Sequence, residues 1–146
     1  MTHPPACTIG QVAIGGGRLA LIAGPCMAES LELCLTVGRS LAALCRRLNV
    51  GYVFKASFDK ANRSSGRSYR GPGLQTGLAW LAEVRRQVGC PVLSDVHDPS
   101  QCPAAGEALD AVQIPAFLCR QTDLLIAAAE TGKCVNIKKG QFLAPW

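Results

Sequence analysis

Short apolar runs and amphipathic helical segments alternate along this chain of 146 residues, and that alternation restricts the folds open to it. Strictly alternating strands and helices form parallel sheets, because each helix carries the chain back to start the next strand in the same direction. The pattern therefore predicts the α/β class. We expect strands at 19–23, 52–57, 91–94, 111–114 and 134–138, with helices at 30–48, 74–88, 100–108 and 122–130.

The segment before the first strand has a different pattern. Residues 8–20 are expected to form a β-hairpin that turns at Gly15-Gly16-Gly17. Ser30 and Ser100 stand where the first and third helices should begin, and a serine hydroxyl can accept a bond from a free helical N–H. We therefore predict one domain over 1–146, with a hairpin at 8–20 and βα units 1 to 4 plus strand 5 over 19–146.

Two architectures fit such a pattern, an open doubly wound sheet and a (β/α)8 barrel. Both place their sites where the strands end, and polar residues of this chain gather after successive strands. No Gly-x-Gly-x-x-Gly sequence opens the first helix, which argues against a dinucleotide site.

Composition limits the possible partners. A hydrophobic fraction of 49% with 17% charged residues is typical of a globular domain. The net charge of +5 is modest and aromatic residues make up 5%, which favours a small anionic ligand over nucleic acid. No apolar run approaches the roughly 20 residues that span a bilayer, and the first five residues lack the features of a signal peptide. We expect no membrane partner and a cytoplasmic location. The eight cysteines show no Cys-x-x-Cys spacing, so most are expected to be reduced, buried thiols.

The segment from Lys55 to Arg70 holds much of the excess positive charge. It follows the apolar run 52–54 and combines lysines, arginines and hydroxyl groups, which together can hold a phosphate. A solvated basic loop is the alternative interpretation of the same composition.

Other polar residues follow other strands. Asp95 and His97 are two residues apart. They are either an acid/base pair or ordinary residues of a loop that enters a helix. Gln113 could present an amide at the mouth of the sheet, which by itself indicates nothing specific. Lys138 ends the last expected strand, where it is either a clamp for phosphate or carboxylate or a solvated strand end. Cys26 ends the first strand, where it is either a metal ligand or a buried thiol.

Several motifs match a known family. The chain resembles 3-deoxy-D-manno-octulosonate 8-phosphate synthase, also called 2-dehydro-3-deoxyphosphooctonate aldolase, from about Ile22 to Trp146. The block around Lys55 is highly specific to that family. The matching motifs are Ala23-Gly-Pro-Cys26, Tyr52-Val-Phe-Lys-Ala-Ser-Phe-Asp-Lys-Ala-Asn-Arg-Ser-Ser65, Tyr69-Arg-Gly-Pro-Gly73, Ser94-Asp-Val-His97, Gln113-Ile-Pro-Ala-Phe-Leu118, Arg120-Gln-Thr-Asp-Leu124 and Asn136-Ile-Lys-Lys139.

The resemblance implies a (β/α)8 barrel that condenses phosphoenolpyruvate with D-arabinose 5-phosphate, a step toward bacterial lipopolysaccharide. It implies that Arg120 reaches a neighbouring subunit's sugar-phosphate site in a homotetramer, and that Asp95 and His97 lie near the reacting centre. The residues implied around phosphoenolpyruvate are Lys55, Ser57, Lys60, Gln113 and Lys138, and those implied around arabinose 5-phosphate are Asn62, Arg63 and Ser64.

The resemblance also assigns the chain to the metal-dependent branch of the family. Cysteine at position 26 is implied as one ligand of a divalent ion, Zn²⁺ or Fe²⁺, whereas the metal-independent branch has asparagine there. The family's other metal ligands and a further phosphate-binding arginine have no counterpart in these 146 residues.

A complete eight-stranded barrel typically needs about 250 residues. We therefore expect a barrel truncated after about five strands, which by itself is poorly stable and inactive. Two alternatives remain open at this point. One is the related synthase that joins phosphoenolpyruvate to erythrose 4-phosphate, and the other is a non-catalytic remnant that binds phosphate weakly or not at all.

Overall fold

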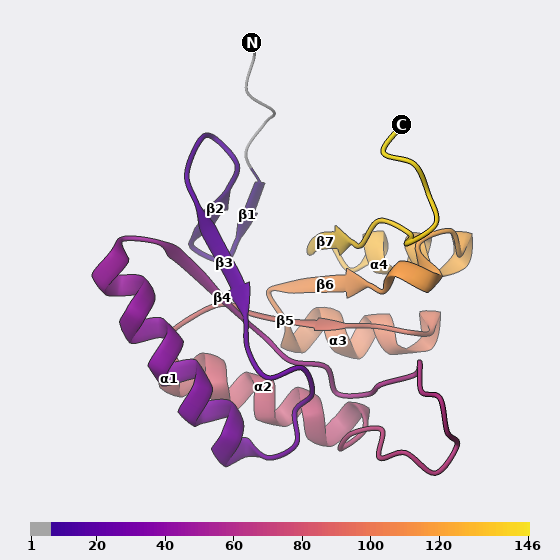
Figure 1. The fold of residues 1–146 in the computed structure, drawn as a ribbon, viewed down its shortest axis with the longest axis horizontal. Helices are drawn as coiled ribbons and strands as arrows, with labels where there is room; N and C mark the ends of the chain where they lie inside the picture. Colours follow the sequence, from indigo (N-terminus) through magenta and orange to yellow (C-terminus); the bar gives the residue numbers. More distant parts are fainter. Residues whose placement is uncertain (1–6) are drawn as a thin grey trace.

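Five parallel strands form the main sheet of the computed structural model, which describes residues 7–146 (Figure 1). Every neighbouring pair is parallel, and the spatial order follows the chain order. A doubly wound sheet would instead reverse its order at a switch point, so sequential order favours the barrel. The strands are β3 (Ala20–Ala23), β4 (Gly51–Lys55), β5 (Val92–Asp95), β6 (Ala111–Ile114) and β7 (Cys134–Ile137).

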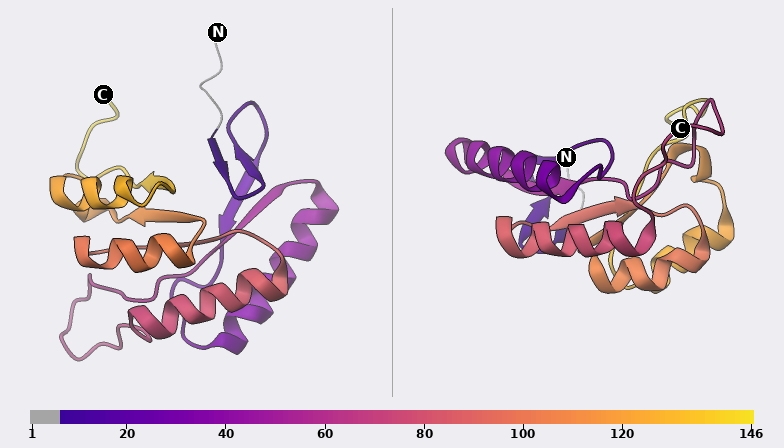
Figure 2. Two further views of the ribbon diagram at one scale, coloured as in Figure 1. Left: turned by 180° about the vertical axis from the view of Figure 1, so that it is seen from behind. Right: turned by 90° about the horizontal axis from the view of Figure 1, so that it is seen from below.

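The sheet is curled, and the helices cover one side of it (Figure 2). This arrangement of sequential βα units is half of a barrel, with β3 and β7 as its two edges. Two short 3₁₀ helices precede the last two α-helices. The helical segments are α1 (Leu31–Leu48), α2 (Leu74–Val88), η1 (Pro99–Gln101), α3 (Cys102–Ala108), η2 (Ala116–Leu118) and α4 (Thr122–Glu130).

Capping residues explain where two of the helices begin. Ser30 caps α1 as expected, since its hydroxyl accepts a bond of 3.1 Å from the backbone N–H of Leu33. The expected cap at Ser100 is wrong, because Asp98 accepts the bond from the Ser100 N–H and starts η1. The serine lies inside the helical turn, and the carboxylate two residues earlier reaches the free donor first.

The N-terminal hairpin is present, but it turns earlier in the chain than expected. The chain does turn at the three glycines, where Gly15 pairs antiparallel with Arg18, but that turn leads from β2 (Val12–Ile14) to β3. Strand β1 (Cys7–Ile9) pairs antiparallel with β2, so the hairpin itself turns at Gly10 and Gln11. Gly10 has φ +55°, and a Cβ there would lie 2.8 Å from Cγ of Pro91. The turn therefore needs glycine for both backbone conformation and close packing.

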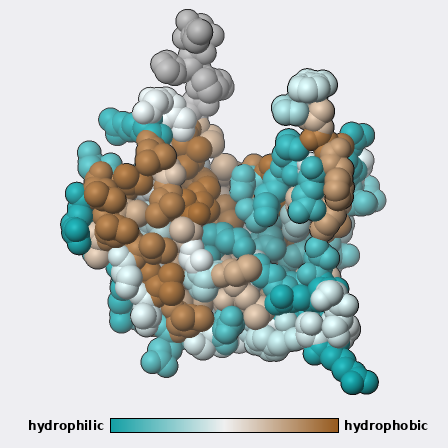
Figure 3. Space-filling model, viewed as in Figure 1, coloured by the Kyte–Doolittle hydropathy of each residue, from teal (hydrophilic) through white to brown (hydrophobic). Residues whose placement is uncertain are grey.

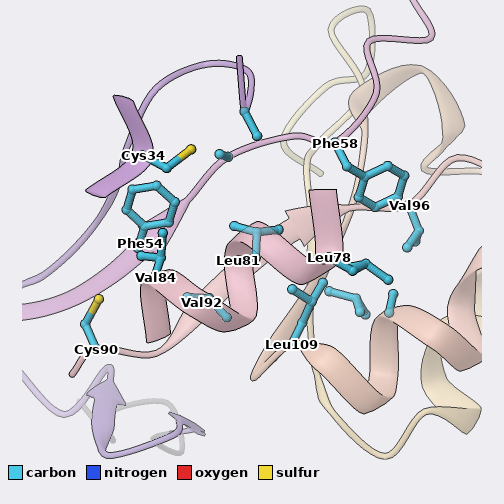
Figure 4. Packing of buried hydrophobic residues seen from close by; sticks show 14 of the residues in the cluster. Cys34, Phe54, Phe58, Leu78, Leu81, Val84, Cys90, Val92, Val96 and Leu109 are labelled. Carbon is cyan, nitrogen blue, oxygen red and sulfur yellow. The ribbon is translucent and has the colours of Figure 1, made fainter. Parts of the chain in front are cut away.

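Two apolar clusters stabilise the fold. The larger one lies between the helices and the sheet and includes Phe54, Phe58 and Leu81 (Figure 4). The smaller one lies at the amino ends of the strands, where Ile9 and Val12 of the hairpin pack on Val53, Leu93 and Ala111. The hairpin thus closes that end of the half-barrel.

One edge of the half-barrel leaves apolar surface exposed. Hydrophobic surface gathers over the hairpin, β3 and α1 in Figure 3. Leu19 before β3 is 76% exposed, and Leu48 at the end of α1 is 62% exposed. Leu48 ends its helix, just before the left-handed residue Asn49, and so lies beyond the buried face. Among residues 7–146, none of the helices is both long enough and apolar enough to pass through a bilayer.

Candidate functional site

The carboxyl ends of the strands bring together most of the polar residues selected from the sequence. The strongest grouping lies where β4 and β5 end, because these strands are parallel neighbours. Ser57 is fully buried there, and Asp95 is 6% exposed. A buried carboxylate requires hydrogen-bonding partners, and each of its partners is a polar residue from the same two chain segments.

The Ser57 hydroxyl lies at the centre of this grouping. It accepts a bond of 2.8 Å from Nζ of Lys55 and one of 2.5 Å from Nζ of Lys60, and it donates to Oδ1 of Asp95. A hydroxyl has one donor and two acceptor positions, so Ser57 uses all of them. The arrangement holds two ammonium groups side by side.

Asp95 is held in its ionised form. Its burial acts to raise the pKa, but bonds from His97 and Ser57 and the charge of Lys55, whose Nζ lies 3.4 Å from Oδ1, together lower the pKa well below the ordinary value. The opposite balance applies to Lys55, where burial lowers the pKa, Asp95 opposes that shift and Lys60 adds to it. Two ammonium groups against one carboxylate leave this cluster with a net positive charge.

His97 completes the cluster through its Nε2, which lies 3.1 Å from Oδ2 of Asp95. The ring packs edge-on against Phe58, with centroids 6.1 Å apart. Its Nδ1 is buried without a hydrogen-bond partner among the residues that the structure describes. The His97 backbone N–H also donates to Oε1 of Gln101 in η1 at 2.8 Å, so this residue contacts both Asp95 and the entry to the next helical segment.

The loop after β4 is folded back on itself. The Arg70 guanidinium binds both carboxylate oxygens of Asp59, at 2.8 and 2.5 Å, and the Lys60 N–H donates to the Arg70 carbonyl at 2.7 Å. Gly71 has φ +122°, and a Cβ there would lie 2.5 Å from the Phe58 carbonyl oxygen. The base of the loop is therefore fixed, and with it the position of Lys60.

A cavity of about 430 Å³ opens beside this cluster. Its polar lining comes from Lys60, Asn62, Asp95 and His97, and the rest of the lining is apolar. Sequence reasoning missed that apolar part, because single apolar residues after a strand give no functional pattern. It consists of Ala61, Pro115, Phe117 and Leu118.

Gln113 lies next to the cluster, in register with Asp95 across β5 and β6. Its side-chain oxygen accepts a bond of 2.8 Å from Nδ2 of Asn136, which the sequence had not selected as a site residue. Lys138 follows β7 and is exposed, and its backbone N–H donates to the Ile114 carbonyl. The structure thus gives Gln113 a fixed orientation and leaves the Lys138 side chain in solvent.

The four residues expected around the sugar phosphate lie outside the buried cluster. Asn62, Arg63 and Ser64 belong to the exposed part of the loop, where Arg63 contacts Sδ of Met27 at 3.8 Å. Arg120 is also exposed, between η2 and α4.

Cys26 lies beside Ser57, whose backbone N–H donates to the Cys26 carbonyl at 3.4 Å. The thiol is exposed, so the alternative of a buried thiol is wrong. Among residues 7–146, no group of three or more His, Cys, Asp or Glu side chains is placed to hold a metal ion. A zinc or iron site needs about four ligands, so the described residues do not form one by themselves.

Sequential parallel βα units with their polar cluster at the carboxyl ends of the strands define a protein of the α/β-barrel class. The chain belongs to the DAHP synthetase I family, an enzyme family whose model matches residues 4–146.

Curated relatives agree with that assignment. The chain is 58% identical over 139 residues to a 2-dehydro-3-deoxyphosphooctonate aldolase of Fusobacterium nucleatum, with 94% of this chain and 50% of the relative covered. Proteins of the same name from Desulfotalea psychrophila and Geobacter sp. are 58% and 56% identical, over 93% and 95% of this chain and 49% and 51% of their own lengths. The chain therefore spans about half the length of these relatives.

Proposed function

We propose that this chain supplies the phosphate-binding part of a 3-deoxy-D-manno-octulosonate 8-phosphate synthase. The reaction joins phosphoenolpyruvate, D-arabinose 5-phosphate and water to give the eight-carbon sugar acid phosphate and inorganic phosphate. The observation that carries the proposal is the pair of ammonium groups, Lys55 and Lys60, on the one Ser57 hydroxyl beside an open cavity. The relatives named 2-dehydro-3-deoxyphosphooctonate aldolase support it.

The cluster has the chemistry to bind an anionic substrate. Each ammonium has three N–H donors and gives one to Ser57, and Lys55 gives a second to Asp95, so one donor on Lys55 and two on Lys60 remain for phosphate or carboxylate oxygens. The net positive charge attracts an anion, and burial strengthens that attraction because solvent screening is weaker there. Phosphoenolpyruvate, which carries both a phosphate and a carboxylate, fits this donor set.

We propose that the exposed residues contact the second substrate. Asn62 lines the cavity, and Arg63 and Ser64 follow it in the same exposed loop. Together they offer an amide, a guanidinium and a hydroxyl to a sugar phosphate. Arg120 is exposed, as it would have to be to reach a neighbouring subunit in the proposed homotetramer. Both substrates are phosphorylated anions that do not cross bilayers unaided, so we place the reaction in the cytoplasm.

The condensation has two parts. The enol carbon C3 attacks the aldehyde carbon, and the aldehyde oxygen takes up a proton. Water adds at C2, and the C2–O bond to phosphate then breaks. Fixed cations stabilise the negative charge that develops on oxygen in both parts. We assign Lys55, Lys60 and Lys138 to that role, Ser57 and Gln113 to substrate orientation, and Asp95 with His97 to holding the ammonium groups in place.

Cys26 remains a predicted ligand of a divalent ion such as Zn²⁺ or Fe²⁺. The described residues place no second and third His, Cys, Asp or Glu beside this exposed thiol, so any such site needs donors beyond them. Because the chain covers about half of its relatives, we expect no condensation by this polypeptide alone. A non-catalytic remnant is the alternative.

Phosphate release from phosphoenolpyruvate tests the proposal. The chain is assayed alone and joined to the remaining half of the Fusobacterium relative, with arabinose 5-phosphate or erythrose 4-phosphate, and with or without a chelator. We expect release from the joined protein only, dependent on arabinose 5-phosphate, and lost on chelation. Release with erythrose 4-phosphate instead would assign the chain to the other synthase, and release from neither would favour the remnant.

A direct binding measurement separates the site from the complete reaction. Titration of this chain with phosphoenolpyruvate should show binding that Lys60→Met weakens by roughly tenfold or more, since a charge-assisted bond is lost. Lys133→Met is the matched control, because Lys133 is an exposed lysine in the turn before β7. Equal affinities for the two variants would contradict the assigned role of Lys60.

A further inference from the structure

Two cysteines far apart in the sequence meet at the closed end of the half-barrel. Sγ of Cys7 lies 3.9 Å from Sγ of Cys134, across a sequence separation of 127 residues. Both thiols are free. Cys7 is exposed and Cys134 is partly buried, so small reagents can reach the pair from solvent.

Regular backbone holds both cysteines in place. Cys7 begins β1 and is in register with Ile14 of the hairpin, and Cys134 begins β7 and is in register with Ala111. Cys134 also packs against the small apolar cluster to which Ile9 of the same hairpin belongs. The contact between the sulfurs therefore results from strand pairing and core packing, and not from the chance position of a loop.

We propose that Cys7 and Cys134 are a reversible disulfide site that joins the N-terminal hairpin to strand β7. A disulfide bond is about 2.05 Å long, so rotation of the two side chains must bring the sulfurs closer than they are in the reduced protein. The oxidant is a low-molecular-weight disulfide such as oxidised glutathione, which accumulates when a cell is under oxidative stress.

The reaction proceeds by two thiol–disulfide exchanges. The Cys7 thiolate attacks one sulfur of the small disulfide, forms a mixed disulfide and releases one small thiol. The Cys134 thiolate then attacks the Cys7 sulfur and releases the second small thiol. Two protein thiols are oxidised to one disulfide and one small disulfide is reduced to two thiols, so atoms and electrons balance.

The order of attack follows from the surroundings of each sulfur. Cys7 is the more exposed thiol and meets the reagent first. Burial raises the pKa of Cys134, and the hydrogen bond and charge of Cys7 raise it further, so Cys134 is the poorer initial nucleophile. Its contact with Cys7 makes it the resolving thiol instead.

The bond would act on the two edges of the sheet. Strand β2 of the hairpin packs beside β3 and β4, whereas β1 packs beside β7. Because β3 and β7 are the edge strands, a covalent bond from β1 to β7 ties the hairpin across the end of the curled sheet. Oxidation should therefore stabilise the half-barrel independently of any catalytic role.

The full chain is fully reduced, incubated with oxidised glutathione, quenched with an alkylating reagent and mapped by mass spectrometry without reduction. We expect two of the eight thiols to be lost and a cross-linked peptide pair that contains Cys7 and Cys134. Oxidation should raise the thermal unfolding midpoint by roughly 5–10 °C. That rise should vanish in Cys7→Ser and Cys134→Ser and persist in Cys119→Ser, whose thiol is also partly buried.

Other outcomes would overturn the proposal. They are a stable glutathione adduct on Cys7 with Cys134 still free, cross-links to other cysteines, or cross-links between chains. The peptide map of the unmodified chain shows which cysteines are cross-linked without the use of any variant. A serine variant that fails to fold therefore does not prevent the test.

Discussion

Ser57 and Asp95 are 38 residues apart in the sequence, yet the Ser57 hydroxyl donates a hydrogen bond to the Asp95 carboxylate. The bond links the segment after β4 to the end of β5, and both residues are buried. The same hydroxyl accepts hydrogen bonds from Lys55 and Lys60. Ser57 therefore holds two ammonium groups and the Asp95 carboxylate in a fixed arrangement.

Replacing Ser57 with alanine should destabilise the chain. The change leaves the buried Asp95 carboxylate without one donor and removes the Ser57 acceptor from both ammonium groups, of which only Lys55 keeps its contact with Asp95, a loss we expect to be about 1–3 kcal/mol. Urea unfolding measures it. Ser40→Ala is the control, because the exposed Ser40 hydroxyl bonds only to the Thr36 carbonyl of its own helix and its loss should change stability by less than about 0.5 kcal/mol.

The stability of the chain should depend on the charge of Asp95. Its folded pKa lies below the unfolded value of about 4, so its contribution is fully present above that pH and is lost as the pH falls toward the folded pKa. Unfolding free energies measured between pH 6 and pH 3 should fall less steeply in Asp95→Asn than in the unmodified chain. Identical slopes would show that Asp95 has an ordinary pKa.

Gly77→Ala should destabilise α2 even though alanine is the better helix former. The new Cβ would lie 2.3 Å from Cβ of Phe58, a fully buried side chain, so the helix must shift. We expect a net loss of about 1–3 kcal/mol in chemical denaturation. Gly66→Ala is the control, because a Cβ at Gly66 meets no atom within 4 Å. Equal stabilities for the two variants would contradict the packing of α2 on Phe58.

Arg70→Ala should loosen the loop after β4 without unfolding the domain. The side chain is exposed and its ion pair with Asp59 is screened by solvent, so the loss of that pair should change the stability of the domain little. Cleavage within residues 60–70 by proteinase K should nevertheless become faster, because the base of the loop is released. Arg86→Ala removes a similar exposed pair, with Glu83 on α2, and should leave that cleavage rate unchanged.

Residue patterns predicted the elements of the sheet well because each strand and helix carries its own periodicity. The helices at 74–88 and 122–130 and the strand at 111–114 have the bounds expected from the sequence. The hairpin turn was misplaced because three consecutive glycines outweighed the single Gly10, whose need for glycine arises from contact with Pro91. That contact is between residues distant in the sequence and leaves no local pattern.

The site could be predicted only in part for the same reason. The lysines and Ser57 were selected from one continuous segment, whereas the bond between Gln113 and Asn136 joins two strands and was missed. The interpretation of Asp95 and His97 depended on neighbours that the sequence does not reveal. The two halves of the Cys7–Cys134 contact lie near opposite ends of the chain, and nothing in their spacing indicated it.

The two ends of the half-barrel differ in how well they should tolerate substitutions, because the hairpin packs against the amino ends of the strands and exposed loops lie at the opposite end. Ile9 and Val12 pack there as tightly as core residues, and a Cβ added to Gly51 would lie 2.7 Å from Val12, so substitutions at that end alter stability. The opposite rim consists of loops such as residues 61–67, which are exposed. Directed evolution of this scaffold should therefore draw its variation from the rim and keep the hairpin end constant.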